Sequence, residues 1–458
     1  MRVSRRPRRL RRIAGPVATG GAGLQSAWRS GVGATRRGIG EATRRLGGEH
    51  VRDGWRRLPA PVRRWAWPVT AIALACTYPF YVNHLFTIPI LGAWPTVNTA
   101  VIMLVFTMMA VGLNVVVGYA GLLDLGYVAF YALGAYTVGW LASAQFSQFD
   151  VRVGAVGVQP GIPGIHLSVW MILIIAAAFT ALCGVLIGLP TLRLRGDYLA
   201  IVTLGFGEIL PQVARNGDDF LGTGFNLTSG AFGISPVDPL GFGSWIGNHT
   251  SLPADFLTEP NSINLYFWSA LALLLLTVFC VVRLRDSRLG RAWIAIREDE
   301  TAAAAMGIPL MRTKTWAYAI GATFGGLAGG FYASFKGSVF PDDFFFGISV
   351  LILSMVILGG LGSVWGAIAG GLLLSYLNYE GLSNIGDYIN THVGTSFDVP
   401  KYSFMIFGII LVVVMLFRPQ GLIPEARRKA EFETGVHDTP LYDVQHHDER
   451  LVDDAGPE

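Results

Sequence analysis

The chain has 458 residues, of which 52% are hydrophobic and only 14% are charged, and its mean hydropathy is +0.48. Soluble domains carry about 25% charged residues, so this composition argues against a soluble protein and predicts an all-α polytopic membrane protein. The three cysteines (Cys76, Cys183 and Cys280) lie in apolar runs without a CxxC pair. They therefore argue against a disulfide framework or a zinc site.

Charge divides the chain into three blocks. Residues 1–64 hold 17 arginines and three acidic residues, whereas residues 425–458 hold 10 acidic and four basic residues. We expect a disordered basic head (1–64), a transmembrane domain (65–424) and an acidic tail (425–458), because the head is rich in glycine and poor in large apolar residues. The favoured partner of the head is anionic membrane lipid, with a transit peptide as an alternative. No nucleic acid is expected, since no aromatic stacking platform accompanies the charge.

Ten apolar segments approach the length of about 20 residues that a membrane-spanning helix needs. They are 65–84, 94–118, 121–143, 168–189, 197–215, 262–283, 313–334, 346–361, 363–380 and 401–417. The segment 121–143 is rich in glycine and is a candidate re-entrant segment. Without the head, lysine and arginine number 13 in the loops of one side and four in those of the other, which predicts that both termini are cytoplasmic.

Charged side chains inside these spans are few, and each is costly unless it faces protein or a water-filled path. Asp124 lies in the run Gly121-Leu-Leu-Asp-Leu-Gly126, whose glycines predict a bend at membrane depth. Its carboxylate either accepts backbone N–H groups within the bend or lines a solute path. For Glu208, a path and a buried partner are equally supported. Asp197 is interpreted as the first residue of its helix, where a carboxylate complements the helix dipole.

Glycine and alanine recur at four-residue spacing in two late spans. Such ladders let two helix backbones approach closely when lipid is as apolar as the side chains. We expect them to pack within the chain, with a face for another subunit as the alternative. The ladders are Gly321, Gly325 and Gly329; Ala322, Gly326 and Gly330; and Gly362, Gly366 and Gly370.

Motifs of common enzymes are absent from the sequence. It contains no GxxxxGK[ST], no HExxH and no Gly-x-Ser-x-Gly. We therefore predict that the chain binds no ATP through a P-loop and carries no catalytic residue, no metal and no cofactor.

Three long blocks are specific enough to indicate a family. The blocks run from Asn114 to Tyr136, from Pro190 to Glu208 and from Gly290 to Gly307. In this order they resemble the LivM-type permease subunit of branched-chain amino-acid ABC importers, and the likeness covers about 94–420. The resemblance implies a transport function in the cell membrane. The residues that we assign to the translocation path are Asn114, Gly121, Asp124, Gly126, Tyr127 and Glu208.

The resemblance also implies partners that the sequence does not contain. They are a second permease subunit, two ATP-binding subunits that hydrolyse the ATP, and an extracytoplasmic amino-acid-binding protein. Permeases for urea and other small solutes share the general layout and remain an alternative. An ion-coupled secondary transporter is a second alternative, for which Asp124 and Glu208 are the only good ion-binding candidates.

The third block is the predicted ATPase-coupling loop. Its alanine run and the following glycine predict a short helix from about 298 to 306. Acidic residues at the start of this helix complement its dipole. In ABC importer permeases a helix of this kind enters a cleft on the ATPase, and the resemblance assigns the same role here. The coupling residues are Gly290, Arg291, Arg297, Glu298, Asp299, Glu300 and Gly307.

Overall fold

The computed structural model describes residues 60–82, 94–154, 162–194, 196–222, 224–241, 263–393, 398–418 and 420–423. The chain divides into two compact units, residues 1–75 and 76–458, and the packing described below is that within the second unit. Most of the predicted basic head (1–64) and the whole predicted acidic tail (425–458) lie outside the described residues.

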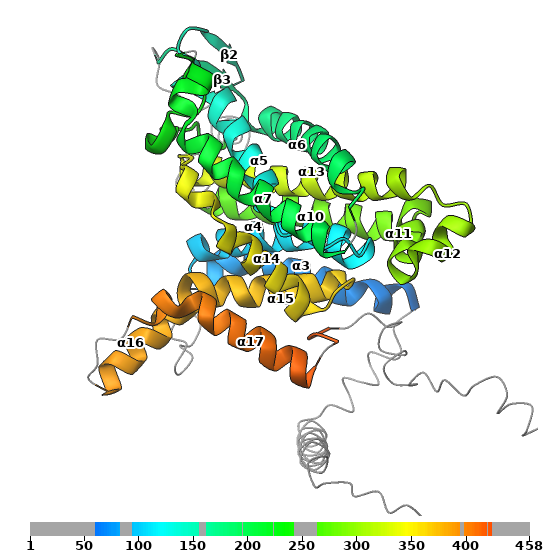
Figure 1. Ribbon diagram of the computed structural model, residues 1–458. Coiled ribbons are helices and arrows are strands. Elements are labelled where there is room, and N and C mark those ends of the chain that lie inside the picture. Colours follow the sequence, from blue (N-terminus) through cyan, green and yellow to red (C-terminus); the bar gives the residue numbers. More distant parts are fainter. Residues whose placement is uncertain are drawn as a thin grey trace, which may run out of the picture. The chain divides into compact units, whose positions relative to one another are not determined.

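The described residues are mainly helical (Figure 1). The α-helices are α3 (Ala60–Tyr81), α4 (Val97–Leu113), α5 (Val128–Leu141), α6 (Val169–Thr191), α7 (Asp197–Arg215), α10 (Ile263–Asp286), α11 (Arg288–Glu298), α12 (Glu300–Ala305), α13 (Leu310–Lys336), α14 (Phe346–Gly359), α15 (Val364–Tyr376), α16 (Leu382–Val393) and α17 (Ser403–Phe417). Two segments, η2 (Asn114–Tyr119) and η7 (Leu377–Gly381), are π-helical. The 3₁₀ turns are η3 (Ala144–Phe146), η4 (Gly217–Gly222), η5 (Gly230–Phe232), η6 (Pro341–Phe344) and η8 (Val399–Tyr402).

Among the described residues, five helical stretches are long and apolar enough to cross a membrane. They are Val97–Tyr119, Val169–Thr191, Ile263–Asp286, Pro341–Gly359 and Val399–Phe417. The protein is therefore polytopic, as the composition predicts.

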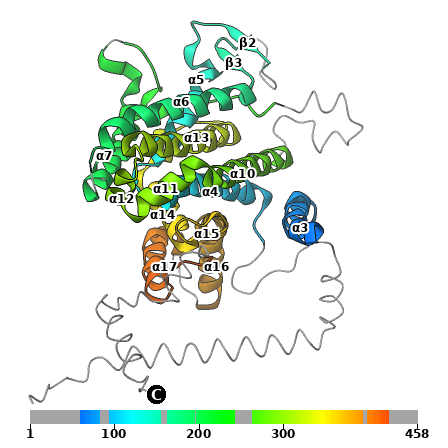
Figure 2. The same cartoon turned by 90° about the vertical axis from the view of Figure 1, so that its right-hand side faces the viewer.

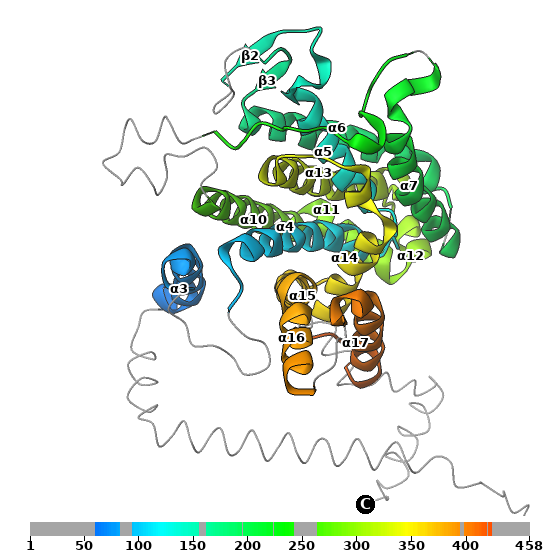
Figure 3. The same ribbon diagram turned by 90° about the vertical axis from the view of Figure 1, so that its left-hand side faces the viewer.

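Helices α4 and α13 form the centre of the second unit. They lie between α6 and α15 in both side views (Figures 2 and 3). Every residue of α4 from Leu104 to Leu113 is buried, and α13 packs against α4, α5 and α6. A helix that is apolar on all sides is expected at such a position, because no face of it meets water.

The glycine ladders of α13 explain this close packing. An added Cβ would lie 2.4 Å from Val116 at Gly321 and 1.8 Å from the Tyr131 carbonyl oxygen at Gly329. At Gly326, on the neighbouring ladder, it would lie 2.1 Å from a side-chain oxygen of α6. The two ladders thus hold different helices of the same chain, which confirms the expected packing within the chain.

Two predicted spans have different bounds in the structure. Residues 120–127 are not helical, so the expected span 121–143 is a turn followed by the short helix α5. The expected span 363–380 is α15 continued by η7, and it leads into α16, which the sequence analysis missed. Hydrophobic periodicity locates apolar stretches of the sequence. The ends of the helices depend instead on side-chain hydrogen bonds and on glycines with positive φ, which periodicity does not show.

A small sheet also departs from the all-α expectation. Strands β1 (Ala142–Ser143), β3 (Ile165–Leu167) and β2 (Val151–Val153) lie in that order, with β1 antiparallel and β2 parallel to β3. The sheet lies in the connection between α5 and α6. In Figure 1 β2 and β3 lie at the opposite end of α13 from α11 and α12.

Candidate functional site

Five of the six candidate path residues lie at a break between α4 and α5. Helix α4 continues into the π-helical segment η2, which begins at Asn114. The Asn114 side chain is fully buried, and its Oδ1 accepts a hydrogen bond from the Gly362 N–H at 2.9 Å. Its Nδ2 has no hydrogen-bond partner within the described residues. Single π-helical turns inside α-helices occur frequently at functional sites.

A turn around Asp124 follows this segment. Gly121 has φ +69°, which starts the turn, and the Asp124 side chain is only 1% exposed. Its Oδ1 accepts the Gly126 N–H at 2.9 Å. The Leu125 N–H donates to Thr203 Oγ1 of α7 at 3.1 Å. Non-helical backbone at membrane depth needs such buried partners, and the Asp124 carboxylate supplies one of them for the turn.

Close contacts hold the turn against two further helices. A Cβ at Gly126 would lie 1.9 Å from the Thr203 carbonyl oxygen, so α7 and the turn approach backbone to backbone. The buried Tyr127 hydroxyl donates to the Gly321 carbonyl oxygen of α13 at 2.9 Å. The turn that contains Asp124, Gly126 and Tyr127 is thus held against α7 and α13.

Glu208 lies away from this turn. Thr203 and Gly207 of α7 pack toward Gly126, whereas Glu208 is exposed on a different side of the helix. Gly205 has open space where a Cβ would be, and Gln212 is exposed. The two carboxylates assigned to the path are therefore not neighbours within this chain.

The predicted coupling loop forms two helices rather than one. Helix α11 was not predicted, and α12 is shorter than the predicted helix 298–306, because Glu298 ends α11 and Asp299 caps α12. Gly290 is required for space, since an added Cβ would lie 2.3 Å from the Arg285 carbonyl oxygen. The exposed Arg291 donates to the Asp286 carbonyl oxygen at 2.8 Å.

Helix α12 is capped at both ends. Asp299 Oδ1 accepts the N–H groups of Thr301 and Ala302 at 2.8 and 3.0 Å and the Thr301 hydroxyl at 2.6 Å. These donors lower the pKa of Asp299, the hydroxyl having the largest effect. The other end is a Schellman motif, in which Gly307 (φ +84°) donates to Ala304 O. Gly307 is needed for its backbone angle, since nothing lies within 4 Å of an added Cβ.

Two side chains that sequence reasoning missed fasten this pair of helices to α13. The fully buried Trp293 donates from Nε1 to the Thr313 carbonyl oxygen at 2.8 Å. The buried Lys314 pairs with Glu300, with 2.7 Å between Nζ and Oε1. A lysine at the start of an apolar span beside an acidic loop was the signal for this pair. Glu300 is therefore an anchor as well as a member of an acidic cluster.

Arg297 joins the coupling loop to the break. Its guanidinium donates to the Gly118 carbonyl oxygen of η2. Its Cγ would lie 2.9 Å from a Cβ added to Gly121. The two groups of residues that the sequence analysis proposed separately are thus in contact.

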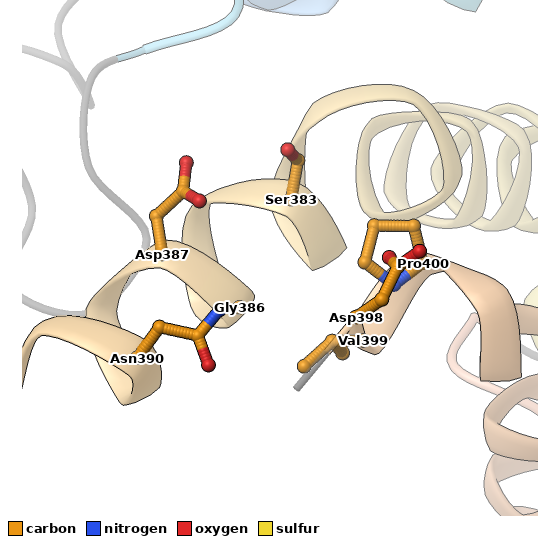
Figure 4. A pocket seen from close by; sticks show the side chains of 7 residues that line it. All are labelled: Ser383, Gly386, Asp387, Asn390, Asp398, Val399 and Pro400. Atoms are coloured by element: carbon orange, nitrogen blue, oxygen red, sulfur yellow. The ribbon is translucent and has the colours of Figure 1, made fainter. Parts of the chain in front are cut away.

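A pocket of about 240 Å³ lies elsewhere, at α16 and η8 (Figure 4). None of the predicted site residues lines it. Its lining residues are Ser383, Gly386, Asp387, Asn390, Asp398, Val399 and Pro400. In the described part of the chain, no group of three or more histidine, cysteine or acidic side chains could hold a metal ion.

Comparison with known proteins gives the chain its family. Residues 96–415 match the model of the permease component of branched-chain amino acid transport systems. The chain is 35% identical over 379 residues to the high-affinity branched-chain amino acid transport permease LivM of Escherichia coli K12, covering 80% of this chain and 77% of that protein. It is 26% identical over 335 residues to a probable LivM of Methanocaldococcus jannaschii, covering 70% of this chain and 90% of that protein.

A second type of permease also matches. The LivH permease of Escherichia coli K12 is 25% identical over 325 residues, covering 70% of this chain and 93% of that protein. No solved structure matches. The match across most of the membrane helices and the identity to LivM together show that this chain belongs to the multi-pass permease components of branched-chain amino acid transport systems.

Proposed function

We propose that the chain is the LivM-type half of the membrane channel of an ATP-driven importer for branched-chain and related hydrophobic amino acids. A second permease, two ATP-binding subunits and an external binding protein complete the importer. The presence of both LivM and LivH among the relatives supports a pair of different permeases. We further propose about ten spans with both termini in the cytoplasm, which the distribution of lysine and arginine supports.

The exposed end of α12 carries this proposal. Met306 is 84% exposed, and Ala304, Ala305 and Gly307 beside it are exposed too. This small apolar surface stands on a pair of helices that Trp293 and the Lys314–Glu300 pair fix to α13. A rigid, exposed and apolar helix end fits a cleft on a soluble partner, because apolar surface of this kind is the usual core of an interface.

A substitution of Met306 tests the ATPase contact. Met306→Glu places a charge in the proposed cleft, so we expect co-purification with the ATP-binding subunits and leucine uptake to fall together. Met306→Leu is the matched control, because it keeps the apolar surface, and it should behave like the parent. Normal uptake and co-purification by Met306→Glu would contradict the proposed contact. Reversing the charge of Glu300 would be a poorer test, since it also breaks the pair with Lys314.

The exposed side of α7 supports a proposal for where the second permease contacts this chain. A carboxylate within a membrane span is costly in lipid, so Glu208 should face protein or water. We propose that Glu208, Gly205 and Gln212 face the solute path between the two permeases. A Glu208→Cys variant should cross-link to the second permease, whereas a cysteine in place of Ile174, which is exposed on α6, should not. Equal cross-linking at both positions would remove the assignment.

The energy source separates this proposal from an ion-coupled transporter. Membrane vesicles that hold the full importer should take up leucine only when ATP is supplied inside. Uptake that continues on an ion gradient after ATP depletion would contradict the proposal. Competition by isoleucine and valine, but not by urea, is the expected result for the substrate class.

A further inference from the structure

Arg297 contacts the break with both parts of its side chain. The aliphatic part lies against the Gly121 backbone, and the guanidinium donates to Gly118 O. Arg297 is half-buried at the junction of α11 and α12, one residue before α11 ends.

The hydrogen bond falls where a cation is favoured. Gly118 belongs to the last turn of η2, whose neighbouring carbonyl oxygens at Val115 and Val116 accept from Ala120 and Leu122 at 3.3 and 3.1 Å. The C-terminal end of a helix carries partial negative charge, so a guanidinium is stabilised there. Arg297 therefore completes the capping of a π-helical segment that ends inside the protein.

Arg297 also belongs to the exposed pair of helices α11 and α12. Arg297 is followed by Glu298 and by the α12 cap, Asp299, so α12 begins at Glu300, three residues beyond the contact of Arg297 with the break. In Figure 1 α11 and α12 lie together at one end of α10 and α13. A force applied to α12 has a short covalent route to Arg297, whose side chain contacts η2.

We propose that Arg297 is the positioning residue that transmits movement of α11 and α12 to the turn at 120–127. This inference rests on the proposed docking of an ATPase at α12 and extends it to a named link with the path. A side chain that only stabilised the fold would affect the amount of folded permease. A side chain that transmits movement would instead affect how much the turn at 120–127 changes when the ATP-binding subunits bind nucleotide.

Two cysteine reporters measure the two ends of this link in the assembled importer. Leu123 is 39% exposed within the turn, and Met306 is exposed at the end of α12. Each is changed to cysteine in a chain whose Cys76, Cys183 and Cys280 are replaced by alanine. Maleimide labelling is then compared between the nucleotide-free importer and the importer trapped with ATP and vanadate.

The test variants remove the contact in steps. Arg297→Met keeps an unbranched stem of similar reach but donates no hydrogen bond, and Arg297→Lys keeps the charge and one donor direction. Arg288→Met is the control, because Arg288 is an exposed arginine of the same helix. With Arg297 intact, Met306→Cys should be protected in the assembled importer relative to the permease without its ATP-binding subunits. Trapping should change the labelling rate of Leu123→Cys by about fivefold or more, the low end of typical coupling between sites.

Arg297→Met should leave the protection of Met306→Cys intact and abolish the change at Leu123→Cys. Uptake per ATP hydrolysed should fall about tenfold, within the range of site-to-site coupling, and Arg297→Lys should restore part of it. Arg288→Met should match the parent in every readout. A preserved change at Leu123→Cys in Arg297→Met would overturn the inference. Absence of protection at Met306→Cys in the parent would instead overturn the proposed ATPase contact.

Discussion

Asn114 and Asp124 are polar side chains buried within the break between α4 and α5, and each accepts a backbone N–H group there. Asn114 reaches across to the turn after α14, whereas Asp124 bonds within its own turn. At the scale of single residues, the break is stabilised by side chains that replace the missing helical hydrogen bonds.

Replacing Asn114 tests the first of these bonds. Asn114→Leu has a similar volume but leaves the buried Gly362 N–H without its partner, which should cost about 1–3 kcal/mol of stability. We expect a lower midpoint of thermal unfolding for the purified permease. Asn216→Leu is the control, since Asn216 is exposed at the end of α7 and, among the described residues, its side chain bonds only to its own helix. An equal shift in both variants would show that the Gly362 bond is unimportant.

Two substitutions of Asp124 separate the effect of its charge from the effect of its hydrogen bond. Asp124→Asn keeps an oxygen for the Gly126 N–H and removes the charge, so a path role predicts reduced leucine uptake at nearly normal membrane abundance. Asp124→Leu loses both functions and should reduce abundance as well. Asp387→Asn on exposed α16 should change neither. Normal uptake by Asp124→Asn would leave Asp124 with the structural role alone.

At the scale of elements, α12 shows how a very short helix is maintained. Six residues are too few for a stable helix on their own, so its caps and its contacts with α13 must hold it. The Asp299 carboxylate begins it, Gly307 ends it, and the Glu300–Lys314 pair fixes its side. Helix α13, which α12 contacts through this pair, is itself packed closely against neighbouring helices at its glycine ladders.

The cap gives a prediction about local stability. Asp299→Ala should increase hydrogen exchange of the amides of residues 301–305, whereas Asp299→Asn should not, since asparagine is an equally good N-cap. The folded pKa of Asp299 is lowered, so its contribution is complete above the ordinary aspartate pKa and is lost only as the pH falls toward the lowered value. Exchange protection of α12, corrected for intrinsic rates, should therefore stay constant between about pH 7 and pH 5. Loss of protection across that range would contradict this role of the carboxylate.

At the scale of the whole molecule, the membrane domain has two different ends. One carries α11 and α12, and the other carries the small sheet (Figure 1). Lysine and arginine collect in the loops of the first end and are scarce in those of the second. This asymmetry supports the proposed orientation, with α11 and α12 on the cytoplasmic side and the small sheet on the external side.

The orientation is tested by labelling intact cells. Phe232 is 90% exposed in the connection between α7 and α10, which the proposed orientation places outside the cell, and Met306 is exposed at the end of α12. A membrane-impermeant maleimide should label a Phe232→Cys variant from outside and a Met306→Cys variant only after the membrane is opened. Both variants lack the three natural cysteines, and the chain without any cysteine is the control. Labelling of Met306→Cys in sealed cells would reverse the orientation.

The sequence by itself determined the membrane class, the family, the glycine ladders and the presence of a helix in the coupling loop, because composition and local spacing carry that information. Only the tertiary structure decided that Arg297 caps η2, 179 residues away, and that Asn114 binds Gly362, 248 residues away. It also decided that Glu208 faces away from Asp124 and that Glu300 is tied to Lys314. Such contacts depend on which helix faces are brought together, and local periodicity does not record this.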